Sequence, residues 1–316
     1  MTLRTAAAGA VLGTAAIATL LAPAPASAFE RTQTCYLGRP LSELGCADGE
    51  QPAFVDWRRA CVPWRIDHTT VGERFFPIII QSFQTWNEVA GSYINLQYAG
   101  LTNQSAIGYD CRTDPDRNVN LVRFTEHWNR SNQIIALTTV TYHSKTGEIY
   151  DADIELNTDR FALDDVDIPD VIADETMDLQ SVMTHEVGHF IGLDHSSDAS
   201  YEGNQNYTHA TMYANTSFGS KSQRVLDDDD IQGISAIYPI AEHNGASCPP
   251  IAASVHTTPD DFDPTRTDDC GTRRRRGCRC DASTREDSRA LLAHGSVVLA
   301  ALVLLRRRRA TRSLAS

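Results

Sequence analysis

Residues 185–195 bring together side chains that can do metal chemistry; the stretch reads His-Glu-Val-Gly-His-Phe-Ile-Gly-Leu-Asp-His. His185 and His189 are four positions apart, so on a helix both imidazoles lie on the same face. Two imidazoles placed in this way can hold one Zn²⁺. Glu186 lies beside that position, where its carboxylate can accept a proton from a zinc-bound water.

A third histidine completes the predicted metal site. Gly192 should end the helix, because glycine adopts the left-handed backbone conformation at little steric cost. The resulting turn brings His195 back toward His185 and His189 as a third ligand. Three protein ligands leave a fourth position open for water, which is typical of a catalytic zinc site and not of a structural one.

A bare His-Glu-x-x-His is often only a polar turn of a helix. Here five fixed positions within eleven residues fit a zinc-peptidase signature. Leu179, Val182 and Met183 precede the stretch at helical spacing and predict an apolar helix face. We therefore predict a metal site that has Glu186 as its catalytic residue.

This stretch resembles the signature of the metzincins, and its surroundings resemble the matrixin branch of that family. Residues 210–213, Ala-Thr-Met-Tyr, are similar to the family's methionine-containing turn, with Met212 followed directly by Tyr as in matrixins. Residues 151–156 resemble the strand before the active-site helix, and residues 226–238 resemble the closing helix. The resemblance covers residues 55–240.

The resemblance implies an α+β catalytic domain over residues 55–240. Its sheet would be twisted and mostly parallel with an antiparallel edge strand, accompanied by an active-site helix and a C-terminal helix. Met212 would pack below the metal without binding it. Extended protein or peptide substrates would pair with the edge strand beside the cleft. The propeptide motif with which many matrixins cap their zinc is absent around Cys35 and Cys61.

Periodicity predicts the elements that position the site. Pro77 suits the first turn of a helix, and apolar residues follow at helical spacings up to Val89. Residues 134–142 and 149–156 are apolar and β-branched, and Thr146-Gly147 between them predicts a hairpin turn. Further strands are predicted at residues 64–67, 94–98 and 119–124.

Both ends of the chain differ in composition from its centre. Residues 1–28 are predicted to be a signal peptide, with an Ala/Leu-rich core and Ala26-Ser27-Ala28 as the cleavage site. Residues 29–54 form an N-terminal segment, and residues 241–283 are predicted to be a linker because little apolar pattern is present. We expect a protein that is secreted or held at the cell surface.

Residues 284–316 are predicted to be an apolar C-terminal tail. The apolar run 290–305 would be about 24 Å long as a helix, which is short for a bilayer core of about 30 Å. Four arginines, 306–309, follow it directly. A cysteine, an apolar run and an arginine cluster resemble the sorting tags of bacterial surface proteins, those of myxobacteria in particular. This resemblance implies transient membrane contact through the tail.

The charge of the chain is divided between body and tail. Residues 29–269 hold 15 Lys/Arg and 38 Asp/Glu, a net charge of −23, and residues 270–316 hold 12 and 3, a net charge of +9. An acidic body repels nucleic acid, which we exclude as a partner. Ca²⁺ is a second candidate cofactor, with Asp151 and Asp153 as candidate ligands, although most of the carboxylates should be solvated surface. The protein is expected to be a monomer.

Eight cysteines in an exported chain predict disulfides. Cys35, Cys46, Cys61 and Cys111 lie in or before the catalytic domain and allow three pairings. Proximity in sequence favours Cys35–Cys46 and Cys61–Cys111. The other four cysteines follow the catalytic domain, at positions 248, 270, 278 and 280.

The function that follows is a secreted or surface-tethered zinc endopeptidase with Glu186 as general base. The alternative is a catalytically idle surface binding protein that keeps the metzincin fold. Intact zinc ligands together with Glu186 argue against it, since a binding role needs no general base. A metal-dependent hydrolase of non-peptide amides is a further alternative, which the predicted cleft-edge strand disfavours.

Overall fold

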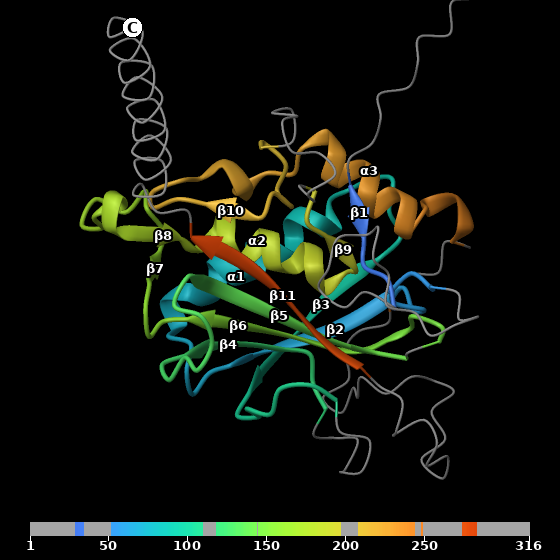
Figure 1. The fold of residues 1–316 in the computed structure, drawn as a ribbon, viewed down its shortest axis with the longest axis horizontal. Helices are drawn as coiled ribbons and strands as arrows, with labels where there is room; N and C mark the ends of the chain where they lie inside the picture. The colour runs from blue at the N-terminus through green and yellow to red at the C-terminus, as the bar shows by residue number, and fades with distance from the viewer. Residues whose placement is uncertain are drawn as a thin grey trace, which may run out of the picture.

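The computed structural model describes residues 29–34, 52–109, 118–143, 145–196, 208–243, 248 and 274–282, the last range as backbone only (Figure 1). The predicted signal peptide, three of the predicted disulfide cysteines (35, 46 and 111) and the predicted tail 284–316 lie outside these residues. Among the described residues, no helix is both long and apolar enough to span a bilayer.

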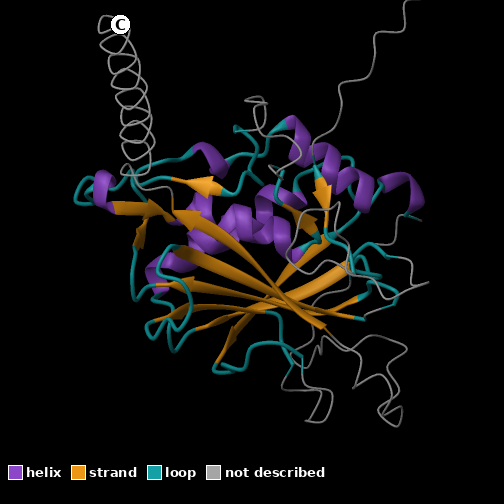
Figure 2. Cartoon of the chain, viewed as in Figure 1, coloured by secondary structure: helices purple, strands orange, loops and turns teal. Residues whose placement is uncertain are grey.

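A seven-stranded sheet forms one layer of the molecule, in the order β10-β11-β5-β6-β4-β2-β3 (Figure 2). Its strands are β2 (Cys61–Asp67), β3 (Asn95–Thr102), β4 (Leu121–Thr125), β5 (Ile134–Tyr142), β6 (Ile149–Asn157), β10 (Asn215–Thr216) and β11 (Arg274–Ala282). The pairs β2–β3, β2–β4 and β4–β6 are parallel, and β5 is antiparallel to β6. This confirms the predicted α+β fold with a mostly parallel sheet.

The main helices are α1 (Phe76–Asn87), α2 (Leu179–Phe190) and α3 (Asp228–Ile237). α1 and α2 pack against each other over the sheet, where the indole of Trp86 donates to the carbonyl of Thr184 at 2.8 Å. Phe83 of α1 stacks on Trp64 of β2 and meets Phe190 of α2 edge to face. These aromatic contacts therefore fix α2 relative to the sheet.

Shorter elements hold the loops around α2. β1 (Glu30–Arg31) pairs with β9 (Leu193–Asp194), so the N-terminal segment lies along the turn that follows α2. β7 (Ala162–Asp164) pairs with β8 (Thr176–Asp178) directly before α2. Four short 3-10 helices complete the described elements at Glu73–Phe75, Ala173–Glu175, Ser222–Arg224 and Ile240–Glu242.

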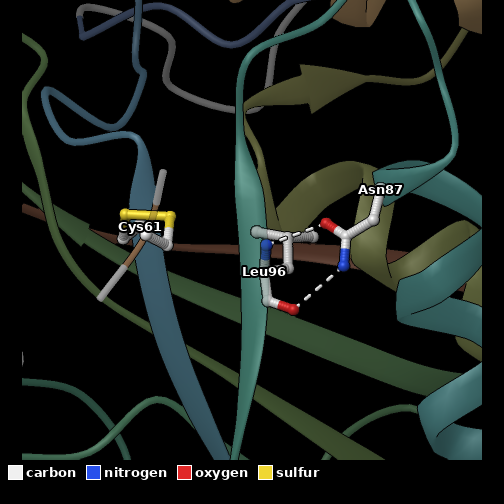
Figure 3. Close-up of a disulfide and its surroundings, with 4 residues drawn as sticks. Cys61, Asn87 and Leu96 are labelled. Carbon is white, nitrogen blue, oxygen red and sulfur yellow. Dashed lines mark hydrogen bonds between the residues drawn. A yellow bond between two sulfur atoms is a disulfide. The ribbon is translucent and has the colours of Figure 1, made fainter. Parts of the chain in front are cut away.

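A disulfide joins Cys61 at the start of β2 to Cys248, with a Cα–Cα distance of 5.6 Å (Figure 3). The predicted pair Cys61–Cys111 is therefore wrong. After α3 the chain returns along the segment before β3, where Gly91 accepts the N–H of Ile240 at 2.9 Å. That return brings Cys248 next to Cys61, although the two residues are 187 positions apart in the sequence. The neighbouring β3 is tied to α1 by two hydrogen bonds between Asn87 and Leu96 (Figure 3).

The segment predicted to be a linker, residues 241–283, contributes both Cys248 and β11 to the domain. β11 pairs antiparallel with β5, so β5 is not the last strand of the sheet. Residues 274–282 have no apolar pattern and still form a strand. Strand pairing uses backbone N–H and C=O groups, and every residue other than proline supplies both. Composition alone therefore could not reveal this strand.

Candidate metal centre

The metal centre begins at α2, which presents His185 and His189 in the interior at 0% and 1% exposure. Asp178 caps the start of the helix by accepting the N–H of Ser181 at 2.9 Å. At the other end, Gly192 has a φ of +93°, the left-handed conformation that the sequence predicted. A Cβ there would also lie 2.2 Å from the carbonyl oxygen of Val55, so only glycine fits.

The turn at Gly192 brings His195 back to the helix. Nε2 of His195 lies 3.1 Å from Nε2 of His189, and the ring centroids of His185 and His195 are 5.2 Å apart. The candidate ligand atoms of the three histidines all lie within 4.8 Å of one another. Within the described part of the chain, these residues form the one group of three or more side chains suited to hold a metal.

Backbone carbonyls orient two of the imidazoles. Nδ1 of His185 lies 2.6 Å from the carbonyl oxygen of Thr211, and Nδ1 of His189 lies 2.9 Å from that of Leu193. A carbonyl can only accept, so each Nδ1 carries the proton and each Nε2 presents a lone pair. This is the tautomer that a metal-ligating histidine requires.

His185 supplies the clearest sign that a cation belongs here. Its Nε2 is buried and has no hydrogen-bond partner among the described residues. Buried polar atoms in folded proteins almost always have a partner, and a metal ion would provide one. Burial, together with His195, lowers the pKa of His185 to about 3, so the ring is neutral. The neutral form of imidazole is the one that binds Zn²⁺.

Glu186 is fully buried next to this cluster, at 0% exposure. The hydroxyl of Thr138, on β5, donates to Oε2 of Glu186 at 2.5 Å and also lies 3.1 Å from its backbone oxygen. The carboxylate is thus held between α2 and β5. Sequence reasoning missed Thr138, because one threonine within a β-branched strand carries no distinguishing signal.

Met212 is 1% exposed and its sulfur packs against α2 at Gly188, while its place below a metal stays a prediction. Asp230 of α3 holds the turn in place. One oxygen of Asp230 accepts the N–H of Thr211 at 2.7 Å, and the other accepts that of Met212 at 3.1 Å. Burial raises the pKa of Asp230 to about 6, although these backbone N–H groups oppose that rise. The sequence placed Asp230 in the closing helix 226–238 and gave no sign of this role.

Two residues after the turn connect it to α2. Gln223 donates to the carbonyl oxygens of Thr211 and Tyr213 at 3.0 and 2.8 Å. Arg224 forms an ion pair with Asp178, the residue that caps α2, and a second one with Asp165. These contacts fix the loop below the site to the start of the zinc helix.

The two aspartates considered for Ca²⁺ are both buried in β6. One oxygen of Asp153 accepts the N–H of Gly108 at 2.5 Å, and the other accepts that of Leu121 at 3.0 Å. Burial, and next the neighbouring Asp151, raise the pKa of Asp153 well above its ordinary value. Both oxygens of Asp153 already serve backbone amides, and calcium binding here stays a prediction.

A mixed sheet, a buried helix with two histidines, a returning third histidine and a methionine turn are the features that the resemblance to the matrixins implied. The chain belongs to the matrixin family, which it matches over residues 56–239. It is similar to human neutrophil collagenase, with 41% identity over 88 residues. That similarity covers 28% of this chain and 16% of the collagenase.

Proposed function

We propose that this protein is a zinc endopeptidase that hydrolyses peptide bonds in protein or peptide substrates. The observation that carries this proposal is the convergence of three imidazoles on one point beside the carboxylate of Glu186. Two of them, His185 and His189, are buried and have Nδ1 tied to a carbonyl. A structural site would need a fourth protein ligand, and the described residues offer three.

His185, His189 and His195 would hold the metal. A zinc ion held there would supply a water of lowered pKa, about 7, and a Lewis acid for the carbonyl of the scissile bond. Glu186 takes a proton onto its carboxylate and can pass it to the nitrogen of the leaving amine. Thr138 orients the carboxylate through its hydrogen bond to Oε2.

Exported action completes the proposal. The predicted signal peptide supports secretion, and the resemblance of residues 284–316 to bacterial sorting tags supports transient tethering at the membrane. The intact mass of extracellular protein tests this point. A mature chain that starts near Phe29 and ends before the apolar run is expected, whereas soluble extracellular protein that still ends at Ser316 contradicts the tether.

Cleavage of casein and gelatin, with and without a chelator, tests the activity. Glu186→Gln should retain zinc and lose activity by about 10²–10⁴-fold, the usual contribution of a general base. His189→Ala should lose zinc as well. Zinc binding without cleavage of any substrate in a peptide library would favour the idle binding protein. A Glu186→Gln variant with most of its activity would place the base elsewhere.

A further inference from the structure

β11 covers the edge of β5 over almost its full length. The register runs from Arg274 opposite Tyr142 to Asp281 opposite Ile134, with one irregularity after Cys280. All nine residues of β5 are buried. Figure 1 shows β11 as the red arrow that runs along β5 in front of α2. A segment far along the chain therefore occupies the strand position next to the zinc helix.

The same segment also reaches the loop after the methionine turn. Its last residues, Asp281 and Ala282, pair in parallel with Asn215 and Thr216 of β10. β11 thus bridges β5 and β10, and it also contacts α2. α2 carries His185 and His189, and β5 carries Thr138, which binds Glu186, so β11 lies next to two elements that hold the metal centre.

The register places the middle of β11 beside the proposed base. Cys278 lies opposite Thr138, whose hydroxyl donates to the carboxylate of Glu186. An extended peptide that placed its scissile bond between the three histidines and this carboxylate could bind by adding to the same edge of β5 through backbone pairing. β11 and such a peptide cannot occupy that edge together.

The charges of the two segments also favour the pairing of β11 with the edge of β5. β11 contains four arginines and one aspartate, and the remainder of the tail is also basic. The body of the protein, residues 29–269, has a net charge of −23. A cationic strand is attracted to an anionic domain even before its backbone pairs.

We propose that residues 274–282 are an intramolecular ligand of the peptide-binding edge, which holds the cleft closed to substrate until the strand is displaced or removed. Occupation of the edge is independent of catalysis. The inhibitory consequence rests on the proposed peptidase function.

Because residues 274–282 belong to the same chain as β5, even a low affinity for its edge can keep that edge occupied. A short flexible tether gives an effective concentration of about a millimolar. A strand with an untethered dissociation constant of about 100 μM would then leave about one cleft in ten open. Displacing it should raise both peptide binding and cleavage about tenfold.

Arg276→Pro/Gly277→Pro in the full chain tests the proposal. Neighbouring amides of a strand point to opposite sides, so one of two adjacent prolines must remove an N–H that faces β5. The matched control, Arg276→Ala/Gly277→Ala, loses the same arginine and keeps both N–H groups. Both cysteines of β11 are unchanged in either variant.

The first readout is binding of a labelled peptide with the sequence of residues 274–282, measured in a Glu186→Gln background so that it is not cut. The proline variant should bind it about tenfold more tightly than the alanine control does. Equal binding overturns the proposal. The second readout is cleavage with Glu186 intact. If the proline variant binds the peptide more tightly but no variant cleaves any substrate, the peptidase function is refuted and β11 still occupies the edge of β5. If it binds more tightly but cleaves at the same rate as the alanine control, β11 does not inhibit the enzyme.

Hydrogen exchange on the chain without β11 substitutions gives a test that does not depend on the folding of the proline variant. A saturating excess of the same peptide, added to the Glu186→Gln chain, should increase exchange at residues 274–282 while β5 stays protected. Unchanged exchange at residues 274–282, under conditions in which the peptide is seen to bind, overturns the proposal.

Discussion

The sulfur of Met212 packs directly against the backbone of α2 at Gly188. A Cβ built on Gly188 would lie 2.1 Å from Sδ of Met212 and 3.0 Å from its Cε. Gly188 stands between two of the zinc histidines, so the floor of the site touches the helix that carries them. Packing with Met212 therefore restricts a position that the zinc signature itself leaves free.

Gly188→Ala should lower the free energy of unfolding by about 1–2 kcal/mol, because Met212 must move to admit the methyl group. Alanine is the better helix former by about 1 kcal/mol, which offsets part of this cost. Urea unfolding measures the change. Gly72→Ala is the control, since a Cβ there meets nothing nearer than 3.7 Å. Equal effects of the two substitutions would contradict the packing argument.

Asp230→Asn should loosen the methionine turn. An amide has one acceptor oxygen, so it cannot accept from both Thr211 and Met212, and an unpaired buried N–H costs about 1–3 kcal/mol. Zinc should also be lost more readily to a chelator, because the carbonyl of Thr211 orients His185. Asp228→Asn removes the same charge at an exposed position of α3 and should leave both stability and zinc retention unchanged.

The buried carboxyl of Asp153 should make the free energy of unfolding fall as the pH rises. Burial and Asp151 raise its pKa, so the folded protein holds a proton that the unfolded chain releases. This contribution to stability is present below the ordinary aspartate pKa of about 4 and is lost as the pH rises through the raised pKa. Asp151→Asn removes the like charge and should flatten that fall.

Urea unfolding at a series of pH values measures the slope. Asp159→Asn, on the exposed turn after β6, is the control and should keep the slope of the original protein. An identical slope for Asp151→Asn would show that the two buried carboxyls do not influence each other.

The disulfide gives a prediction about stability and connectivity. Cys61→Ser/Cys248→Ser should lower the free energy of unfolding by about 2–4 kcal/mol, because the bond closes a long loop in the unfolded chain. The bonded residues are 187 positions apart in the sequence. Peptide mapping of the oxidised protein should recover Cys61 joined to Cys248. Recovery of Cys61 joined to Cys111 would refute this pairing.

The metal centre was predictable because its ligands are close in the sequence. His185, His189 and His195 lie within one helix and one turn, so helical geometry and the glycine at 192 already determine their convergence. The strand β5 was predicted with the bounds that the structure has, Ile134–Tyr142. A run of β-branched and apolar residues bounded by turn residues was sufficient there.

What the sequence did not reveal depends on contacts between distant segments. The hydrogen bond from Thr138 to Glu186 joins residues 48 positions apart. The carboxylate of Asp230, on α3, accepts a hydrogen bond from the N–H of Met212. The Cys61–Cys248 bond and the β11 strand depend on where the chain returns after α3. No local periodicity encodes such a return path, since it follows from the packing of the whole domain.

The bond between Cys61 and Cys248 makes the intervening chain a covalent ring. The three candidate metal ligands, Glu186 and the methionine turn lie inside that ring. One proteolytic cut between the two cysteines opens the ring without separating any piece from the molecule. The disulfide keeps the two pieces of a nicked molecule joined, so electrophoresis separates them only after a reductant is added. A nicked sample would therefore give one band on a gel without reductant and two smaller bands on a gel with reductant.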